Sequence, residues 1–476
     1  MSSTPRPFAG SLILSELKGA WTSWVAVLVA FIVTSASIVL AVLAIDSLAA
    51  TVASGKVPES EGPALLFLPI WNLALAIIGT LSVISAVTGL VVQARRGALA
   101  RLALAGATPG QVSRILLGQL AIVAIAGSVV GIVIAIVVQP FAVAEAVGER
   151  GASRDLAIVR VDPVLVIVAV AVFVLFALLA GLKQARSAAA VAPVEALRTM
   201  PGAEVRRRRI LRWVGAVLVA LTAVGVATAA IAAAPELGVD GGDTVMQAAV
   251  GCILLTSIVL SLSAPLTIGL LTRAWTALVP SRSASWVLAR AAVVARGERL
   301  SRTVTPIAMA VGMIVGLQAI TRAVVVVLDQ LGRDQIEHAG TAAVLGLIGL
   351  VLLIAISGGV SAVLIMSRQR EAELALAGVV GATRSQQILI PVWEGIIVTV
   401  TATILGLVMS AVGSIVFAVG TSALNLGVTA PVVVPWLELV VVMLVCAVIV
   451  VAATTLPVLR SLGRPARQVV AQLVAE

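Results

Sequence analysis

Residues able to carry chemistry are few in this chain of 476 residues. It has one histidine, His338, and two cysteines, Cys252 and Cys446, so it offers neither a histidine-rich metal centre nor a thiolate cluster. No segment matches the G-x-x-x-x-G-K-[ST] pattern that holds nucleotide phosphates. We therefore expect no catalytic residue, no bound metal or cofactor and no enzymatic activity in the chain itself.

One short pattern of residue types occurs twice. Residues 95–137 and 370–412 align without a gap, 275 residues apart. The apolar composition could supply matching Val and Ala residues, but hardly a Gly-Ala-Thr sequence in register with flanking Arg and Gln. The identical pairs include Arg95 and Arg370, Leu99 and Leu374, Gly106 and Gly381, Ala107 and Ala382, Thr108 and Thr383, Gln111 and Gln386, and Gly131 and Gly406.

The first copy predicts a short amphipathic helix and a turn at the inner face of a membrane. Leu99 and Leu102 fall on one stripe of a helix over residues 95–106. Gly106 would then end this helix in the left-handed conformation. Thr108 would cap the helix that follows.

The second copy repeats this plan with Leu374, Gly381 and Thr383. A short helix with small residues at its tip suits a groove on a partner protein, and two copies suggest two grooves. The alternative is that Arg95 and Arg96 anchor a membrane span and that Gly-Ala-Thr is a simple turn.

The composition places these patterns in a membrane protein. Hydrophobic residues make up 61% of the chain and charged residues 11%. Soluble domains are about 45–50% apolar and about 25% charged. A soluble enzyme, a nucleic-acid-binding protein and a disordered chain are therefore excluded, even though the net charge is +10.

Ten stretches are long and apolar enough to cross a bilayer as helices. They cover residues 20–45, 64–93, 115–139, 163–182, 213–234, 245–272, 303–328, 339–366, 388–418 and 435–458. With the N-terminus inside, the inner segments hold 26 Lys and Arg residues and the outer loops hold 5. This bias predicts ten spans with both termini in the cytoplasm.

The outer loops are short and acidic. This acidity reflects either avoidance of positive charge outside the cell or an anionic vestibule that favours cationic ligands. The basic stretch at residues 281–302 is interpreted as an interfacial helix that leads into the seventh span.

The repeat also organises the chain into modules. Each copy begins in an inner loop and leads into two spans, and each module then closes with a proline segment near Pro193 or Pro465. We expect an all-α protein with two four-span modules at residues 1–200 and 281–476, joined by a two-span connector at residues 201–280. An even number of spans between the copies predicts a pseudo-two-fold axis along the membrane normal.

Polar groups inside predicted spans are functional candidates. Glu394 lies about one and a half turns into the ninth span and could bond a neighbouring helix or transmit motion, and Gln119 is its counterpart in the first copy. Arg322, near the outer end of the seventh span, can reach the membrane surface by extending its side chain. Glu438 occupies an ordinary position at the membrane interface.

The doubled pattern, followed each time by two spans and a proline segment, resembles the FtsX-like permease family, the membrane subunits of type VII (MacB-like) ABC transporters. The resemblance covers about residues 10–200 and 285–470. The ten-span layout is similar to the BceB-like branch, in which one permease serves two ATPases. The resemblance implies that two cytoplasmic ATPases dock on each chain and that these partners bind ATP and Mg²⁺. The residues implied in docking are Arg95, Arg96, Leu99, Leu102, Gly106, Ala107, Thr108, Arg370, Glu371, Leu374, Gly381, Ala382 and Thr383.

The chain departs from the family pattern in places. The acidic residue that follows the first arginine is present as Glu371 but is replaced by Arg96 in the first copy. The glutamate common early in the third span is Glu394 in one copy and Gln119 in the other. Residues 46–63 and 329–338 are too short to hold the large extracytoplasmic domain of many family members.

These features together predict a permease in a bacterial plasma membrane, in contact with lipid. By resemblance to the family, closure of partner ATPases would displace residues 95–106 and 370–381. This movement would drive export or release of an amphipathic or hydrophobic substrate, such as an antimicrobial peptide, a drug or a lipid. An ATPase-driven signalling subunit without transport is the alternative. A secondary transporter is disfavoured because no midplane charge relay is evident.

Overall fold

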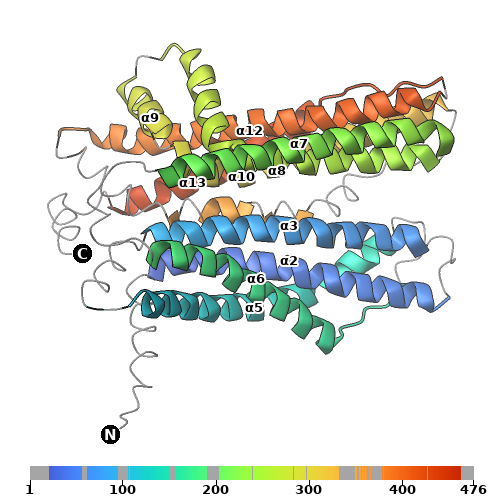
Figure 1. Ribbon diagram of the computed structural model, residues 1–476, viewed down its shortest axis with the longest axis horizontal. Coiled ribbons are helices and arrows are strands. Elements are labelled where there is room, and N and C mark those ends of the chain that lie inside the picture. The colour runs from blue at the N-terminus through green and yellow to red at the C-terminus, as the bar shows by residue number, and fades with distance from the viewer. Residues whose placement is uncertain are drawn as a thin grey trace, which may run out of the picture. The chain divides into compact units, whose positions relative to one another are not determined.

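The computed structural model of the chain describes residues 21–55, 62–94, 106, 108–148, 156–189, 203–237, 240–281, 283–295, 297–331, 349–350, 353–354, 356–361, 364–365, 378, 380–425 and 427–461 (Figure 1). Within these ranges the chain is helical and has no strand. The helices are α2 (Trp21–Ala53), α3 (Gly62–Ala94), α5 (Pro109–Gly148), α6 (Pro163–Ala189), α7 (Ala203–Leu237), α8 (Asp240–Ala277), α9 (Ala284–Ala295), α10 (Gly297–Gln330), α12 (Arg384–Ala423) and α13 (Trp436–Ser461).

Nine of the described helices are long and apolar enough to cross a membrane, and only α9 is shorter. This confirms the predicted all-α membrane protein with many spans. The eighth predicted span, residues 339–366, lies largely outside the described residues, although its described pieces between residues 349 and 365 are helical. The number ten therefore stays a prediction.

The two longest described helices extend beyond the spans predicted within them. α5 and α12 each contain 40 residues. At about 1.5 Å per residue, such a helix extends about 60 Å, twice the thickness of the hydrocarbon core. Each of these helices therefore continues without a break from one side of the membrane to the other and beyond it.

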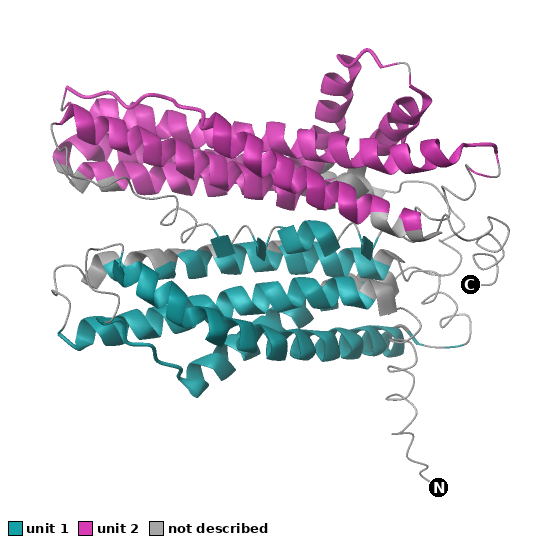
Figure 2. Ribbon diagram, turned by 180° about the vertical axis from the view of Figure 1, so that it is seen from behind, with its two compact units in different colours: residues 1–200, 345–366 teal, residues 201–344, 367–476 magenta. Residues whose placement is uncertain are grey.

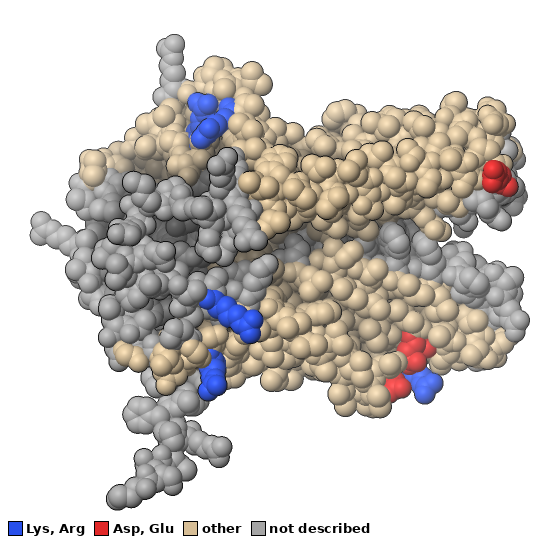
Figure 3. All heavy atoms as spheres, viewed as in Figure 1, with Lys and Arg blue, Asp and Glu red and all other residues tan. Residues whose placement is uncertain are grey.

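The chain forms two compact units (Figure 2). Unit 1 comprises residues 1–200 and 345–366, and unit 2 comprises residues 201–344 and 367–476. We call the end of each unit at which α5 or α12 begins its inner end, and the opposite end its outer end. On the face drawn in Figure 3, Lys and Arg lie toward the inner ends and Asp and Glu toward the outer ends, apart from one basic group beside the acidic residues of unit 1.

The core of unit 1 centres on α2. Phe31 of α2 is fully buried and meets Phe173 of α6 edge to face, with ring centroids 5.7 Å apart. In addition, several buried residues of α3 and α5, among them Ile84 and Ala124, join the same apolar cluster.

Part of the eighth predicted span belongs to unit 1. Ile354 is fully buried in the unit 1 core and lies 3.2 Å from the position of a Cβ at Gly79 of α3. The Ser361 hydroxyl donates a hydrogen bond to the Ala26 carbonyl of α2 at 2.6 Å. A segment that follows α10 in sequence thus packs on α2 and α3.

Unit 2 is built around α12, which packs against α8, α9, α10 and α13. Its core contains three tryptophans from different helices. Trp286 of α9 meets Trp275 of α8 and Trp393 of α12, with ring centroids 6.3 Å and 5.2 Å apart. The predicted connector, α7 and α8, therefore belongs to the same compact unit as α10, α12 and α13.

Candidate functional site

The glycines of the two Gly-Ala-Thr turns share a left-handed backbone conformation. Gly106 has φ +93° and Gly381 has φ +108°, both in the left-handed region that favours glycine. A Cβ at either glycine would meet no atom within 4 Å, so conformation rather than lack of space requires glycine there. The prediction that these two glycines end a helix in the left-handed region is confirmed for their backbone conformation.

A reciprocal pair of hydrogen bonds starts the helix after each turn. In the first copy, the Thr108 backbone N–H donates to Gln111 Oε1 at 2.9 Å and the Gln111 N–H donates to Thr108 Oγ1 at 3.4 Å. In the second, the Thr383 N–H donates to Gln386 Oε1 at 3.0 Å and the Gln386 N–H donates to Thr383 Oγ1 at 3.3 Å. Each pair is a capping box, which satisfies two backbone donors at a helix start. The predicted caps are confirmed, and the repeated glutamine explains why they match.

Both turns are accessible to a partner. Gly106, Thr108, Gly381 and Thr383 are exposed. Val380, directly before the second turn, is 88% exposed. Val380 therefore adds an exposed apolar side chain to the surface beside the second turn. The sequence interpretation missed Val380 because its counterpart is Ala105 and the repeat does not mark it.

The remaining predicted docking residues, Arg95, Arg96, Leu99, Leu102, Ala107, Arg370, Glu371 and Leu374, lie outside the described residues. Ala382 is described and is half-buried, and its carbonyl accepts a hydrogen bond from Gln387 Nε2 at 3.4 Å. The predicted amphipathic helices at residues 95–106 and 370–381 thus stay predictions, whereas the turns that follow them have defined geometry.

The helices that start at the turns pack closely on the first helix of each predicted module. A Cβ at Gly131 of α5 would lie 2.9 Å from the Ala36 nitrogen of α2. A Cβ at Gly406 of α12 would lie 2.9 Å from the Gly312 nitrogen of α10. The two glycines are a registered pair of the repeat, so the same backbone contact occurs in both units. Both glycines thus allow close packing of two helices.

Gln119 and Glu394 occupy equivalent places in the two copies. Both side chains are buried, at 1% and 4% exposure, on α5 and α12. Each lies eleven residues after its capping threonine, on the helix that begins there. That Glu394 bonds a neighbouring helix or transmits motion from the turn stays a prediction.

Arg322 and Glu438 form an ion pair that sequence reasoning missed. Arg322 lies on α10 and Glu438 on the first turn of α13, and Arg322 Nη2 contacts Glu438 Oε1 directly. The arginine was expected to reach for the membrane surface alone and the glutamate to be an ordinary interface residue. The pairing instead joins two helices at the outer end of unit 2.

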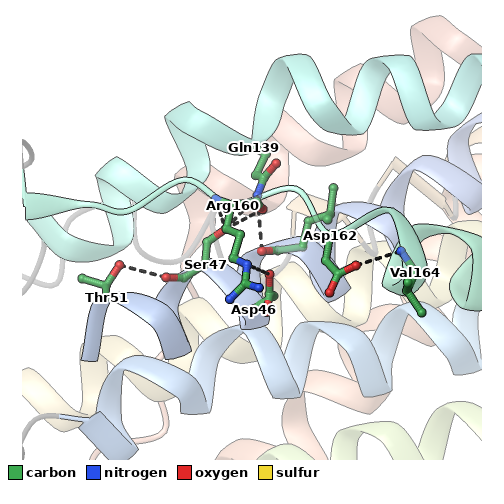
Figure 4. A network of polar contacts seen from close by, with 8 residues as sticks. Asp46, Ser47, Thr51, Gln139, Arg160, Asp162 and Val164 are labelled. Carbon is green, nitrogen blue, oxygen red and sulfur yellow. Dashed lines mark hydrogen bonds and ion pairs between the residues drawn. The ribbon is translucent and has the colours of Figure 1, made fainter. Parts of the chain in front are cut away.

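A polar network joins α2, α5 and the segment before α6 at the outer end of unit 1 (Figure 4). Gln139 of α5 is fully buried, and its Nε2 donates to Ser47 Oγ at 2.8 Å and to the Arg160 carbonyl at 2.7 Å. Ser47 Oγ accepts the Arg160 N–H at 3.1 Å, and Thr51 Oγ1 accepts the Ile158 N–H at 3.0 Å. These contacts hold the extended segment against α2.

The outer ends of the two units show related contacts with opposite charge. Asp46 Oδ2 of α2 lies 3.9 Å from Arg160 Nε. Ala36 and Gly312 occupy equivalent places in the close helix contacts, so the first helices of the two modules correspond with an offset of 276 residues. By this offset, Arg322 is the counterpart of Asp46. The first helix of each predicted module thus carries one member of a charged pair, Asp46 in unit 1 and Arg322 in unit 2. Its partner is Arg160, three residues before α6, in unit 1 and Glu438, on the first turn of α13, in unit 2.

These features recur in a known family. A model of the FtsX-like permease C-terminal domain matches residues 72–193 and again residues 345–466. The two matches have equal length and together span just over half of the chain. The chain belongs to the FtsX-like permease family. A search of the curated proteins finds no match.

The two FtsX-like matches each contain one capped turn and the two helices after it. The family indicates an ABC transporter membrane subunit, and FtsX-like permeases generally act with cytoplasmic ABC ATPases and are not enzymes themselves. The second match begins at residue 345, so residues 345–366 belong to the second repeat in sequence and to unit 1 in space. The repeat modules and the compact units are therefore divided differently.

Proposed function

We propose that this FtsX-like permease couples ATP hydrolysis by two cytoplasmic ATPases to export or release of an amphipathic or hydrophobic substrate. The observation that carries the proposal is the pair of exposed, identically capped turns, each at the start of a 40-residue helix. ATP and Mg²⁺ are bound by the ATPases. Both termini, and the inner ends of both units, lie in the cytoplasm of a bacterial cell.

Continuous helices carry the motion in this proposal. When the ATPases close, they displace residues 95–106 and 370–381. The capping boxes make each turn continuous with α5 or α12, so the displacement passes along those helices rather than being absorbed in a loose loop. Close contacts at Gly131 and Gly406 transfer it to α2 and α10.

The outer contacts then pass the motion to the fourth helix of each module. Arg160 and the segment around it are bonded to α2, and Glu438 is bonded to Arg322 of α10. Displacement of α2 or α10 thereby moves the start of α6 or α13. Antimicrobial peptides, hydrophobic drugs and lipids are the proposed substrate classes, because an apolar membrane interior suits amphipathic molecules.

The stoichiometry of the complex tests this proposal. The tagged permease is co-expressed with its cognate ATPase, recovered, and its native mass measured. We expect two ATPases per chain, one in Leu99→Asp or Leu374→Asp, and none in the double variant. Val432→Asp, at an exposed apolar position in the segment before α13, is the matched control and should retain both ATPases.

Two results would overturn the proposal. One is a wild-type permease that recovers no ATPase. The other is full ATPase binding in a double variant that elutes as a folded monodisperse species. If both ATPases bind and hydrolyse ATP but reconstituted vesicles move none of the three substrate classes, the signalling alternative replaces transport.

A further inference from the structure

A helical hairpin stands out from the side of unit 2 near its inner end (Figures 1 and 2). It consists of the end of α8, the short connection that begins at Leu278, and α9. We propose that this hairpin binds the phosphate of an anionic phospholipid in the adjacent leaflet, with Arg273 and Arg290 as its ligands. The inference does not depend on ATPase docking.

The two faces of α9 are both apolar. One face, formed by Trp286, Ala289 and Val293, is buried against the protein. The opposite face carries Val287 and Leu288, each 53% exposed. A helix with an exposed apolar face at the edge of a membrane protein lies among the acyl chains near the headgroups.

The turn of the hairpin extends this apolar surface. Leu278 is 82% exposed, and Leu270, two turns earlier on α8, is 56% exposed. Exposed apolar side chains gathered on one hairpin are unfavourable in water and favourable in lipid. The occupant of this surface is therefore the bilayer itself.

Two arginines mark the level of the headgroups. Arg273 is exposed on α8. Arg290 lies at the border between the two faces of α9, and its Nε donates a hydrogen bond to Thr276 Oγ1 of α8 at 2.9 Å. Thr276 is one helical turn beyond Arg273, so the bond brings Arg290 onto the part of α8 that carries Arg273. Figure 3 shows basic side chains gathered on this hairpin.

The charge of the hairpin is unbalanced. Residues 266–295 contain Arg273, Arg282 and Arg290 and no Asp or Glu. A guanidinium offers paired N–H donors that match phosphate oxygens. The inner leaflet carries anionic lipid, and each basic residue near it contributes about 1 kcal/mol of attraction, about a fivefold gain in affinity.

Tryptophan fluorescence provides the readout. Trp275 and Trp286 belong to the two helices of the hairpin and contact each other. The full-length permease is reconstituted with brominated phosphatidylglycerol or brominated phosphatidylcholine, whose tails quench nearby tryptophans. We expect stronger quenching by the anionic lipid at equal mole fraction, equivalent to a several-fold higher relative affinity.

Variants distinguish binding of the lipid phosphate by these two arginines from general electrostatic attraction between the protein and anionic lipid. Arg273→Gln should lower the relative affinity for the anionic lipid about fivefold, and the Arg273→Gln, Arg290→Gln double variant should remove the preference. Arg186→Gln, at an exposed arginine near the inner end of α6, is the matched control and should keep it. Arg273→Lys should retain part of the preference, because it keeps the charge but not the paired donors.

A headgroup site and a free phosphate site are also distinguished. Inorganic phosphate and soluble glycerol phosphate should not reduce the quenching by anionic lipid. Competition by either compound would overturn the proposal in favour of a site for a soluble anion. Equal quenching by both lipids in the wild type would show that the hairpin has no preference for anionic lipid, and would also overturn the proposal. If the Arg290 variant loses its fold, Arg273→Gln alone decides the outcome, since the Arg273 side chain is exposed.

Discussion

At the scale of single residues, the two turns depend on glycine for its backbone freedom. Gly106→Ala and Gly381→Ala each force a side chain into a left-handed conformation, at a cost of about 1 kcal/mol. We expect each variant to weaken ATPase recovery at its own turn and to lower thermal stability slightly. Native mass and a thermal unfolding midpoint measure the two effects.

Gly110→Ala is the control for this pair. Gly110 lies in the first turn of α5, has an ordinary helical conformation, and has open space around its Cβ position. Alanine there should be neutral or slightly stabilising. Equal losses at Gly110 and Gly106 would show that the left-handed conformation is not what the turn requires.

The outer ion pair of unit 2 is a second feature of single residues. Arg322→Glu or Glu438→Arg places like charges together at the contact between α10 and α13. We expect each single reversal to lower the unfolding midpoint. The loss in the free energy of unfolding should exceed the roughly 1 kcal/mol that exposed pairs contribute. The double reversal should restore most of the loss, as measured by thermal unfolding in one detergent.

Arg186→Glu reverses the charge of an exposed arginine near the end of α6 and should leave the midpoint unchanged. A double reversal as unstable as the two single ones would contradict a direct pair. The sequence could not reveal this pair, because its members lie 116 residues apart on two different spans. Each residue taken alone had an ordinary explanation at the membrane interface.

At the scale of elements, the contact of α5 with α2 is matched by that of α12 with α10. Gly131→Leu and Gly406→Leu should each separate their helix pair, because even a Cβ at these positions would lie 2.9 Å from backbone nitrogen. Overpacking of this kind costs about 1–3 kcal/mol. We expect lower unfolding midpoints and uncoupled ATPase activity in both variants.

Gly225→Leu of α7 supplies the comparison, since no atom lies within 4 Å of a Cβ there. It should retain wild-type stability and coupling. Unchanged coupling in Gly131→Leu, together with wild-type ATPase binding, would contradict transfer of motion through this contact.

Much of the fold follows from residue patterns at this scale. Apolar stretches marked the helices, and the repeated Gly-Ala-Thr and Gln marked two turns whose caps form as expected. The lengths of α5 and α12 were underestimated, because hydropathy marks only the part inside the membrane. The network around Gln139 was missed because it depends on backbone groups of a distant segment, which leave no residue pattern.

At the scale of the whole molecule, the repeat predicted which helices are related but not which ones pack together. Residues 349–365 follow α10 in sequence, yet Ile354 and Ser361 are buried in unit 1. Local sequence patterns do not predict such packing, since any apolar helix with small residues can pack against another. Glycine at positions 79 and 358 permits the close approach seen here.

A disulfide tests this placement. A Cβ at Gly358 would lie 3.3 Å from Val83 Cβ, close to the 3.5–4.5 Å that disulfides span. We expect Val83→Cys with Gly358→Cys to form a disulfide under oxidation, so that the chain stays joined after cleavage at a protease site inserted at residues 190–202. Leu353→Cys in place of Gly358→Cys should not cross-link, since Leu353 is 54% exposed. Efficient cross-linking by both pairs would contradict the placement.

The position of residues 349–365 also sets an order of events during synthesis. The ribosome completes α2, α3, α5 and α6 long before it reaches Ile354 and Ser361. Until then the Ala26 carbonyl and the α3 surface at Gly79 and Val83 lack the helix that covers them. The first half of the chain, made alone, is consequently an unfinished unit, and its maturation must wait until α7 to α10 have been inserted.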